Sequence, residues 1–372
     1  MRLTAIELRR VALPLTRPFR TSFGTQTARD VLLVRVMTEA AEGWGECAAL
    51  TRPVYSPEYV DSAHAVIRDV FAPDLLARDH LEAHHVGLHL ERYLGHPMAK
   101  SAVETAVLDA QLRAQGISLA SHLGAVRDRV DCGVSVGIAD TVEALVEEVG
   151  GYLEQGYRRI KLKIEPGWDV EPLTAVREAF GAEVLLQVDA NTAYGPADTR
   201  HLRALDAFDL ALIEQPFAHD DLHLHAELAA VLQTPVCLDE SITSSATAAL
   251  ALQLGSCSII NIKAGRVGGY LEAVRVHDVA RAMARPVWCG GMLETGIGRA
   301  ANVALAALPG FTLPGDTSAS DRYFSQDLTQ PFVLDDGQLE VPRGPGIGVE
   351  IDLEYIERIT THRALLRRSP GT

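Results

Sequence analysis

Three carboxylates recur at one fixed interval: Asp189, Glu214 and Asp239 each stand 25 residues after the last. Each ends a short apolar run, in the sequences LLQVD, LALIE and PVCLD. A repeat of this length fits one strand, one helix and two short connections, so each strand would carry one ionisable residue at its C-terminal end. In a β/α barrel these ends meet at one mouth, where active sites lie.

Lysines continue the same rhythm on both sides of the carboxylates. Lys163 ends RRIKLK and Lys263 ends SIINIK. Lys161 alternates with Lys163, so both side chains point to one face of the strand. Crowding of two ammonium groups and burial lower a lysine pKa, which makes a neutral base available near pH 7. A carbon acid bound between Lys163 and Lys263 would have one lysine on each face.

The carboxylates form an oxygen-rich set of ligands. Hard divalent cations such as Mg²⁺ prefer oxygen ligands, and open positions on the metal could take a substrate carboxylate. Such a metal would neutralise the negative charge that develops on the substrate carboxylate as the proton on the neighbouring (α) carbon leaves. The alternative, that strand-end acids only cap the following helices, does not explain three acids in phase with the flanking lysines.

Three further side chains lie close to these positions in the sequence. Asn191 and Glu240, just beyond two of the ligands, are expected to orient them. Arg266 follows Lys263 closely, and it would either tune that lysine electrostatically or pair with a neighbouring acid.

Length, composition and charge limit the class of protein. The 372 residues, with 47% apolar and 22% charged side chains, suit a globular barrel plus a smaller domain. The net charge of -15 disfavours nucleic acid and anionic membranes as partners. The start, MRLTAIELRRVALPL, does not resemble a secretion signal, and no apolar run is long enough to span a bilayer. The five cysteines form no CxxC pair, which favours buried thiols in a reducing cytoplasm.

The chain divides into two patterns. In residues 1–125, two strand patterns (TAIELRRVALPL and DVLLVRVMT) precede helical patterns at 57–70, 80–94 and 99–115, which predicts an α+β capping domain. Residues 126–329 alternate strand and helix and predict an α/β barrel, with 314–328 as a loop. The tail from about 330 to 372 reads as short strands and turns, part of which returns to the cap. The eight strand ends are expected near Ser135, Lys163, Asp189, Glu214, Asp239, Lys263, Gly290 and Leu313.

Several motifs resemble one known family. KLKI, VDAN, IEQP, LDES and NIKAGRVGG resemble the enolase superfamily in its muconate-lactonising-enzyme subgroup. VWCGGMLETGIGRAAN and LPGDTSASDRYF are similar to the o-succinylbenzoate synthase and N-succinylamino acid racemase family within it. The resemblance covers nearly the whole chain. It implies a modified (β/α)8 barrel of the (β/α)7β type, with an α+β cap. It also implies Mg²⁺, or Mn²⁺, Co²⁺ or another divalent metal, at the three carboxylates, with Lys163 and Lys263 as the acid/base pair.

The resemblance also implies which residues face the substrate. On the barrel these are Ser135, Gly291, Met292, Leu293, Glu294 and Thr295. On the cap, loops 18–25 and 50–59 would close the mouth, and their candidate contacts are Phe19, Phe23 and Tyr55. The alternative for these aromatic side chains is packing within the loops.

Two reactions remain open, and the resemblance implies that one enzyme can carry out either or both. Racemisation of N-acylamino acids, with succinyl as the favoured acyl group, requires a base on each face. Synthesis of o-succinylbenzoate, a dehydration on the menaquinone pathway, can use one lysine while the other stays cationic. A dipeptide epimerase fits less well, because Asp316 is followed two places later by Ser318 where that group has a second Asp. A barrel without catalytic activity is the alternative from a different class. We expect a small carboxylate substrate, a homo-oligomer and a cytoplasmic location.

Overall fold

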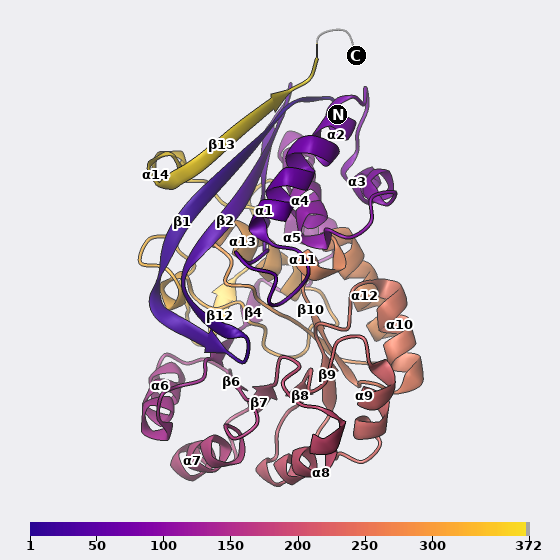
Figure 1. Cartoon of the computed structure of the whole chain (residues 1–372). Coiled ribbons are helices and arrows are strands. Elements are labelled where there is room, and N and C mark those ends of the chain that lie inside the picture. Colours follow the sequence, from indigo (N-terminus) through magenta and orange to yellow (C-terminus); the bar gives the residue numbers. More distant parts are fainter. Residues whose placement is uncertain (370–372) are drawn as a thin grey trace.

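The computed structural model describes residues 1–369, which form two parts, each built on its own β-sheet (Figure 1). An antiparallel sheet with flanking helices lies above a parallel sheet that is surrounded by helices. This arrangement agrees with the predicted α+β cap on an α/β barrel.

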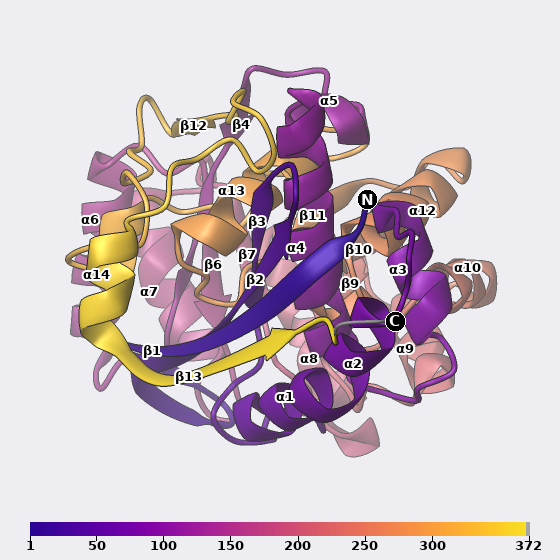
Figure 2. The same cartoon turned by 90° about the horizontal axis from the view of Figure 1, so that it is seen from above.

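The cap sheet is built around one long hairpin. Its strands pair in the order β13, β1, β2, β3, all antiparallel. Seen from above, β13 lies beside β1 over the barrel (Figure 2). The hairpin extends beyond the predicted strands, and its tip reaches the barrel, where Ile138 N donates to Arg20 O at 3.0 Å. The bounds are β1 (Leu3–Thr21), β2 (Gly24–Thr38), β3 (Glu42–Cys47) and β13 (Thr360–Arg367).

Small residues allow the longest cap helix to lie directly on β3. A Cβ atom at Gly45 would stand 2.0 Å from Ala102 O, and one at Gly43 would stand 2.2 Å from Ala106 O, so only glycine fits at this contact. The helix ends at Gly116, which adopts the left-handed conformation usual after a helix end. The cap helices are α1 (Val60–Val66), the π-helical turn η1 (Ile67–Phe71), α2 (Ala72–Leu76), α3 (Ala83–Leu90), α4 (Pro97–Gln115) and α5 (Leu119–Leu123).

The barrel sheet has seven parallel strands in sequential order from β5 to β11. Their residues are almost all buried, as expected when helices cover a parallel sheet. The strands are β5 (Gly133–Val136), β6 (Arg159–Lys163), β7 (Leu186–Asp189), β8 (Ile213–Glu214), β9 (Val236–Leu238), β10 (Ile259–Ile262) and β11 (Val287–Cys289). The connecting helices are α6 (Val142–Glu154), α7 (Val170–Phe180), η2 (Pro196–Asp198), α8 (Thr199–Leu202), η3 (Arg203–Phe208), α9 (Leu222–Ala229), α10 (Ser245–Leu254), α11 (Ala264–Val267), α12 (Tyr270–Ala282) and α13 (Gly296–Ala306).

The predicted eighth strand, ending near Leu313, does not form as a regular strand. Phe311 makes a single bridge to β11, and Gly315 makes one to Cys132, just before β5. Gly133 N donates to Gly315 O at 2.7 Å, so this segment still joins the two edge strands. Pro314 explains the difference, because proline lacks the N–H that a continuous ladder needs.

The last segment lies partly against the barrel and partly in the cap. The predicted loop 314–328 contains one short 3₁₀ turn, η4 (Ser320–Arg322). β12 (Gln338–Glu340) pairs with β4 (Arg129–Asp131) rather than with the cap sheet. The return to the cap is made by α14 (Leu353–Ile359) and β13, which the sequence patterns did not single out.

Two further expectations concern the whole chain. All five cysteines are free and buried, as predicted. Among residues 1–369, none of the helices combines the length and the apolar character that crossing a bilayer requires.

Candidate active site

Three adjacent strands bring the predicted metal ligands side by side. Asp189 ends β7 and is paired in register with Glu214, which ends β8. Asp239 follows β9 directly, two residues beyond Cys237, which is paired with Glu214. All three carboxylates are at most 1% exposed. The 25-residue rhythm therefore places them at one edge of the sheet, as predicted.

Three of the four lysines of the chain converge on these carboxylates. Lys163, from β6, donates to Asp189 Oδ2 at 2.6 Å. Lys263, directly after β10, donates to Asp239 Oδ2 at 2.8 Å. The strand order β6 to β10 puts the two lysines on either side of the three acidic strands.

Lys161 is held in a different environment from Lys163. Its Nζ lies 2.7 Å from Asp316 Oδ2 and 3.3 Å from both Asp189 and Glu214. Burial alone would lower the pKa of Lys161, but Asp316 and the other carboxylates hold it above the usual value. Burial lowers the pKa of Lys163, and the Lys161 ammonium contributes to this. Of the two lysines on β6, Lys163 is therefore the one disposed to be neutral.

A second cluster surrounds Asp239. The sequence left two roles open for Arg266, tuning Lys263 or pairing with a neighbouring acid. In the structure Arg266 forms an ion pair with Asp239. Tyr55, from the cap, places its hydroxyl 3.2 Å from Asp239 Oδ1 and accepts from Lys263 at 3.3 Å. Burial opposes charge on Lys263, but Tyr55 and Glu214 hold its pKa above the usual value.

Asn191 and Glu240 extend the network from Asp189. Lys163 donates to Asn191 Oδ1 at 2.6 Å, and Asn191 Nδ2 donates to Glu240 Oε1 at 2.9 Å. Burial, together with the charge of Asp189, raises the pKa of Glu240 to about 7. The Glu240 Oε2 atom is buried without a hydrogen-bond partner. This unpartnered oxygen indicates that the site suits one more positive group.

The donor chemistry fits a hard divalent cation. Three buried carboxylates and an unpartnered carboxylate oxygen supply the oxygen ligands that such ions prefer. Among the described residues, the group whose ligand atoms all lie within 4.8 Å of one another is a different one, Glu82, His84 and His85 of the cap. The barrel carboxylates do not all lie within that distance of one another: Lys161 pairs with both Asp189 and Glu214, and Lys263 and Arg266 both pair with Asp239.

The segment 291–295 is folded by its own side chains. Met292 Sδ lies 3.6 Å from Lys263 Nζ, which places this residue at the site. Glu294 accepts from Met292 N at 2.7 Å, and Leu293 takes a positive φ of 60°. Thr295 is fully buried and binds Glu46 of the cap. A Cβ atom at Gly291 would stand 2.8 Å from Asp316 O, so the segment also lies directly on the residues that close the barrel.

The remaining predicted substrate contacts lie in different places: some at the barrel mouth, one buried in the cap and one inside the barrel. Phe23 packs on Tyr55, with ring centroids 6.3 Å apart, so these two residues of separate cap loops meet at the mouth. Phe19 is buried, and the Arg322 guanidinium, from outside the cap loops, lies over its ring. Ser135 donates to Asp316 Oδ2 at 3.3 Å inside the barrel. Their roles toward a substrate remain predictions.

The sequence reasoning did not predict the contacts of two residues at the site. Asn261 Nδ2 donates to Glu214 Oε1 at 2.6 Å. Its position two residues before Lys263 in SIINIK would have placed it on the same face of the strand. The sequence named Asp316 only in comparison with the dipeptide epimerases; its ion pair with Lys161 was not predicted, because Asp316 lies outside the regular strand rhythm.

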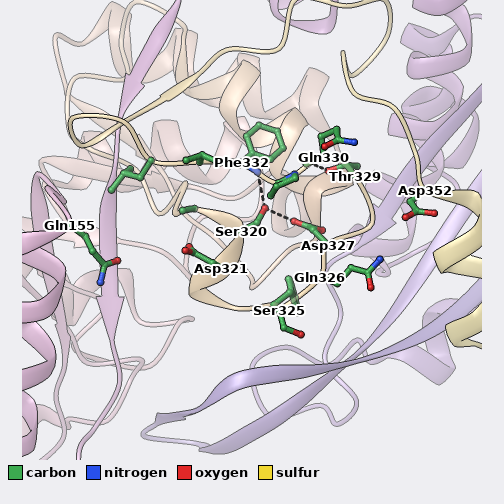
Figure 3. A pocket seen from close by; sticks show the side chains of 15 residues that line it. Gln155, Ser320, Asp321, Ser325, Gln326, Asp327, Thr329, Gln330, Phe332 and Asp352 are labelled. Carbon is green, nitrogen blue, oxygen red and sulfur yellow. Dashed lines mark hydrogen bonds between the residues drawn. The ribbon is translucent and has the colours of Figure 1, made fainter.

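A separate cavity of about 640 Å³ lies along the loop after the barrel (Figure 3). None of the described residues that line it belongs to the predicted site. Its polar groups bind one another: Ser320 donates to Asp327 Oδ2 at 2.5 Å and accepts from Phe332 N at 3.0 Å. Asp327 also accepts from Gly296 N at 2.6 Å, so this network supports the start of α13.

Comparison with known proteins agrees with the fold. Residues 144–356 match the family described as enolase C-terminal domain-like, and residues 5–124 match the mandelate racemase / muconate lactonizing enzyme N-terminal domain. An N-succinylamino acid racemase from an Amycolatopsis species is 61% identical, over 97% of this chain and 98% of its own. An o-succinylbenzoate synthase from Geobacillus kaustophilus is 45% identical, over 97% of each chain. A crystal structure of an enolase-superfamily member from Listeria innocua superposes with a TM-score of 0.95 at 39% identity, covering 99% of this chain and all of that one. The predicted resemblance is confirmed, and the chain belongs to the mandelate racemase and muconate-lactonising-enzyme family of the enolase superfamily.

Proposed function

We propose that this enzyme is an N-acylamino acid racemase, with succinyl as the favoured acyl group. It would remove the proton α to the substrate carboxylate and return a proton to either face. The relative that is 61% identical carries the name of this activity.

One observation carries the proposal. Lys163 and Lys263 come from strands on either side of the three acidic strands, and each binds a different carboxylate, Asp189 or Asp239. Racemisation needs one proton-transfer group on each face of the α-carbon, and this pair meets that need. Lys161 is excluded from that role by its ion pair with Asp316.

The carboxylates and the lysines have separate roles in this proposal. Asp189, Glu214 and Asp239 would hold Mg²⁺, Mn²⁺ or Co²⁺, which when bound neutralises charge that develops on the substrate carboxylate. Lys163, whose pKa is lowered by burial, accepts the proton on one face. Lys263, whose pKa is raised, delivers a proton on the other. In the reverse direction the two lysines exchange roles, because the same path is followed backwards.

Synthesis of o-succinylbenzoate is the second candidate. The observation in its favour is the raised pKa of Lys263, since that reaction can use a lysine that stays cationic while the other transfers both protons. The relative at 45% identity is named for this activity. Dipeptide epimerisation fits less well, because Asp316 is occupied by Lys161 and Arg159 rather than open to a substrate ammonium group.

Proton NMR in D₂O tests the proposal. Each enantiomer of N-succinylphenylalanine is followed with Mg²⁺, alongside a chelated control. We expect metal-dependent loss of the α-proton signal and decay of optical rotation from either enantiomer. No exchange from either enantiomer would reject the racemase and leave dedicated o-succinylbenzoate synthesis, assayed in parallel, as the activity.

The proposal also covers the substrate class, the oligomeric state and the location of the protein. We expect a small carboxylate substrate and a homo-oligomer in the cytoplasm, without nucleic acid or membrane partners. Light scattering at micromolar protein concentration would measure the subunit count directly.

A further inference from the structure

Glu46 of the cap binds the first turn of a barrel helix. Its carboxylate accepts from Thr295 Oγ1 at 2.6 Å, from Thr295 N at 3.1 Å and from Gly298 N at 3.0 Å. Thr295 precedes α13, an eleven-residue helix whose first amides lack partners within the helix. A negative charge at this end of a helix is favoured by the helix dipole. Glu46 therefore caps a barrel helix from the other domain.

The contact is built closely and buried. Glu46 is 9% exposed, although it carries a carboxylate. A Cβ atom at Gly298 would stand 3.0 Å from Glu46 Oε2 and 2.8 Å from Glu294 Cβ, so glycine leaves room for the carboxylate here. A buried carboxylate without hydrogen-bond donors costs free energy. Removing the partners of Glu46, or its charge, should therefore disturb the turn that it binds.

The capped turn is continuous with the active site. Thr295 ends the segment 291–295, in which Met292 Sδ contacts Lys263 Nζ at 3.6 Å. Leu293 holds a positive φ of 60°, a conformation that costs free energy unless its surroundings enforce it. On the other side of the turn, Asp327 accepts from Gly296 N. Two carboxylates, one from the cap and one from the loop after the barrel, thus fix this turn.

We propose that Glu46 is a positioning residue, through which the cap domain holds the segment 291–295 and with it the Lys263 side of the active site. The inference rests on the two-lysine function proposed above. It assigns Glu46 no contact with the substrate. Lys163 lies on β6, and its hydrogen bonds go to Asp189 and Asn191 rather than to this segment. The effect of Glu46 should therefore fall on one face of the substrate.

The first test compares α-proton exchange in the wild type and in Glu46→Gln, for both enantiomers. The enantiomer whose exchange depends on Lys263 is identified with Lys263→Ala. Glu46→Gln should slow exchange of that enantiomer about tenfold more than exchange of the other, since small misplacements of a reacting group are costly. Equal slowing of both, or no change, would overturn the inference. Glu42→Gln is the matched control and should leave both rates unchanged, because Glu42 lies on the same strand but is exposed and pairs with the half-buried Arg35.

The second test does not depend on the substrate. Amide hydrogen exchange, read by mass spectrometry on peptides covering 290–300, should show faster exchange in Glu46→Gln than in the wild type and in Glu42→Gln. Unchanged protection there would also reject the inference. If the wild type exchanges neither enantiomer, the proposed function fails while this measurement still decides the role of Glu46. Thr295→Val, which removes the hydroxyl that binds Glu46, serves as the second variant if Glu46→Gln does not fold.

Discussion

Lys161 Nζ lies 2.7 Å from Asp316 Oδ2, and this buried ion pair ties β6 to the segment that closes the barrel. Asp316 binds Arg159 as well, with its Oδ1 atom 2.9 Å from the guanidinium. The two cations and the carboxylate are each at most 7% exposed. The segment that contains Asp316 has no regular strand pairing, so these ion pairs help to hold it against the barrel in place of a ladder of backbone hydrogen bonds.

Asp316→Asn should destabilise the fold by about 3–5 kcal/mol, because two buried cations lose their shared carboxylate. Urea denaturation followed by circular dichroism would measure the free energy of unfolding. Asp335→Asn is the control: Asp335 is exposed and pairs with Arg129, so its loss should cost about 0.5 kcal/mol or less. Equal stability of the two variants would contradict a structural role for the Asp316 ion pairs.

Lys163→Ala should lower α-proton exchange by ~10²–10⁴ for the enantiomer whose proton faces Lys163. It should also stop racemisation from either enantiomer, because each direction of that reaction needs this lysine as base or acid. In the wild type, exchange that depends on neutral Lys163 should rise as pH increases through its lowered pKa. Lys100→Ala, which removes the fourth lysine of the chain, should leave exchange unchanged; its Nζ binds Tyr93 O in the cap. Near-normal exchange of both enantiomers in Lys163→Ala would show that the base is misassigned.

Lys263→Ala separates the two faces of the site. We expect racemisation to stop, while exchange of the α-proton persists for the enantiomer whose proton faces Lys163. Optical rotation and proton NMR recorded on the same samples would distinguish these outcomes. Loss of exchange for both enantiomers would instead mean that Lys263 is needed as a cation beside the substrate, as in the second candidate reaction.

Glu104→Gln should change how stability depends on pH. Glu104 of α4 is 4% exposed and accepts from Leu271 N at 3.1 Å, and burial raises its pKa to about 7. Because the folded pKa lies above the unfolded value, its contribution is fully present below about pH 4.5 and is lost as pH rises through about 7.

The variant and the wild type should therefore converge near pH 4.5. At pH 8 the variant should be more stable by about 1–3 kcal/mol, since glutamine never has to bury a charge. Urea midpoints measured at pH 4.5, 6 and 8 would show this divergence. A constant difference between the two proteins across that range would mean that Glu104 does not titrate in this interval.

Local patterns in the sequence predicted the barrel and the convergence of its charged groups. Asp189, Glu214 and Asp239 could be placed together because parallel strands end at one edge of a sheet, whatever the remaining contacts are. The two long cap strands, though not their full length, and the cap helices also followed from alternating and helical patterns. Asn261 was within reach of the same reasoning, since it alternates with Lys263.

The sequence by itself thus determined the β/α rhythm, the cap, and which strands carry the acids and lysines, because these depend on short-range periodicity. Tertiary structure alone decided which charges meet across the fold. Asp316 reaches Lys161 from a segment that proline keeps out of the ladder, and Glu46 reaches Thr295 from the other domain, 249 residues away. Such pairings depend on the packing of distant elements, which leaves no periodic trace in either partner's surroundings. The same packing sets the opposite pKa shifts of Lys161 and Lys163, which differ in their carboxylate neighbours although they share one strand.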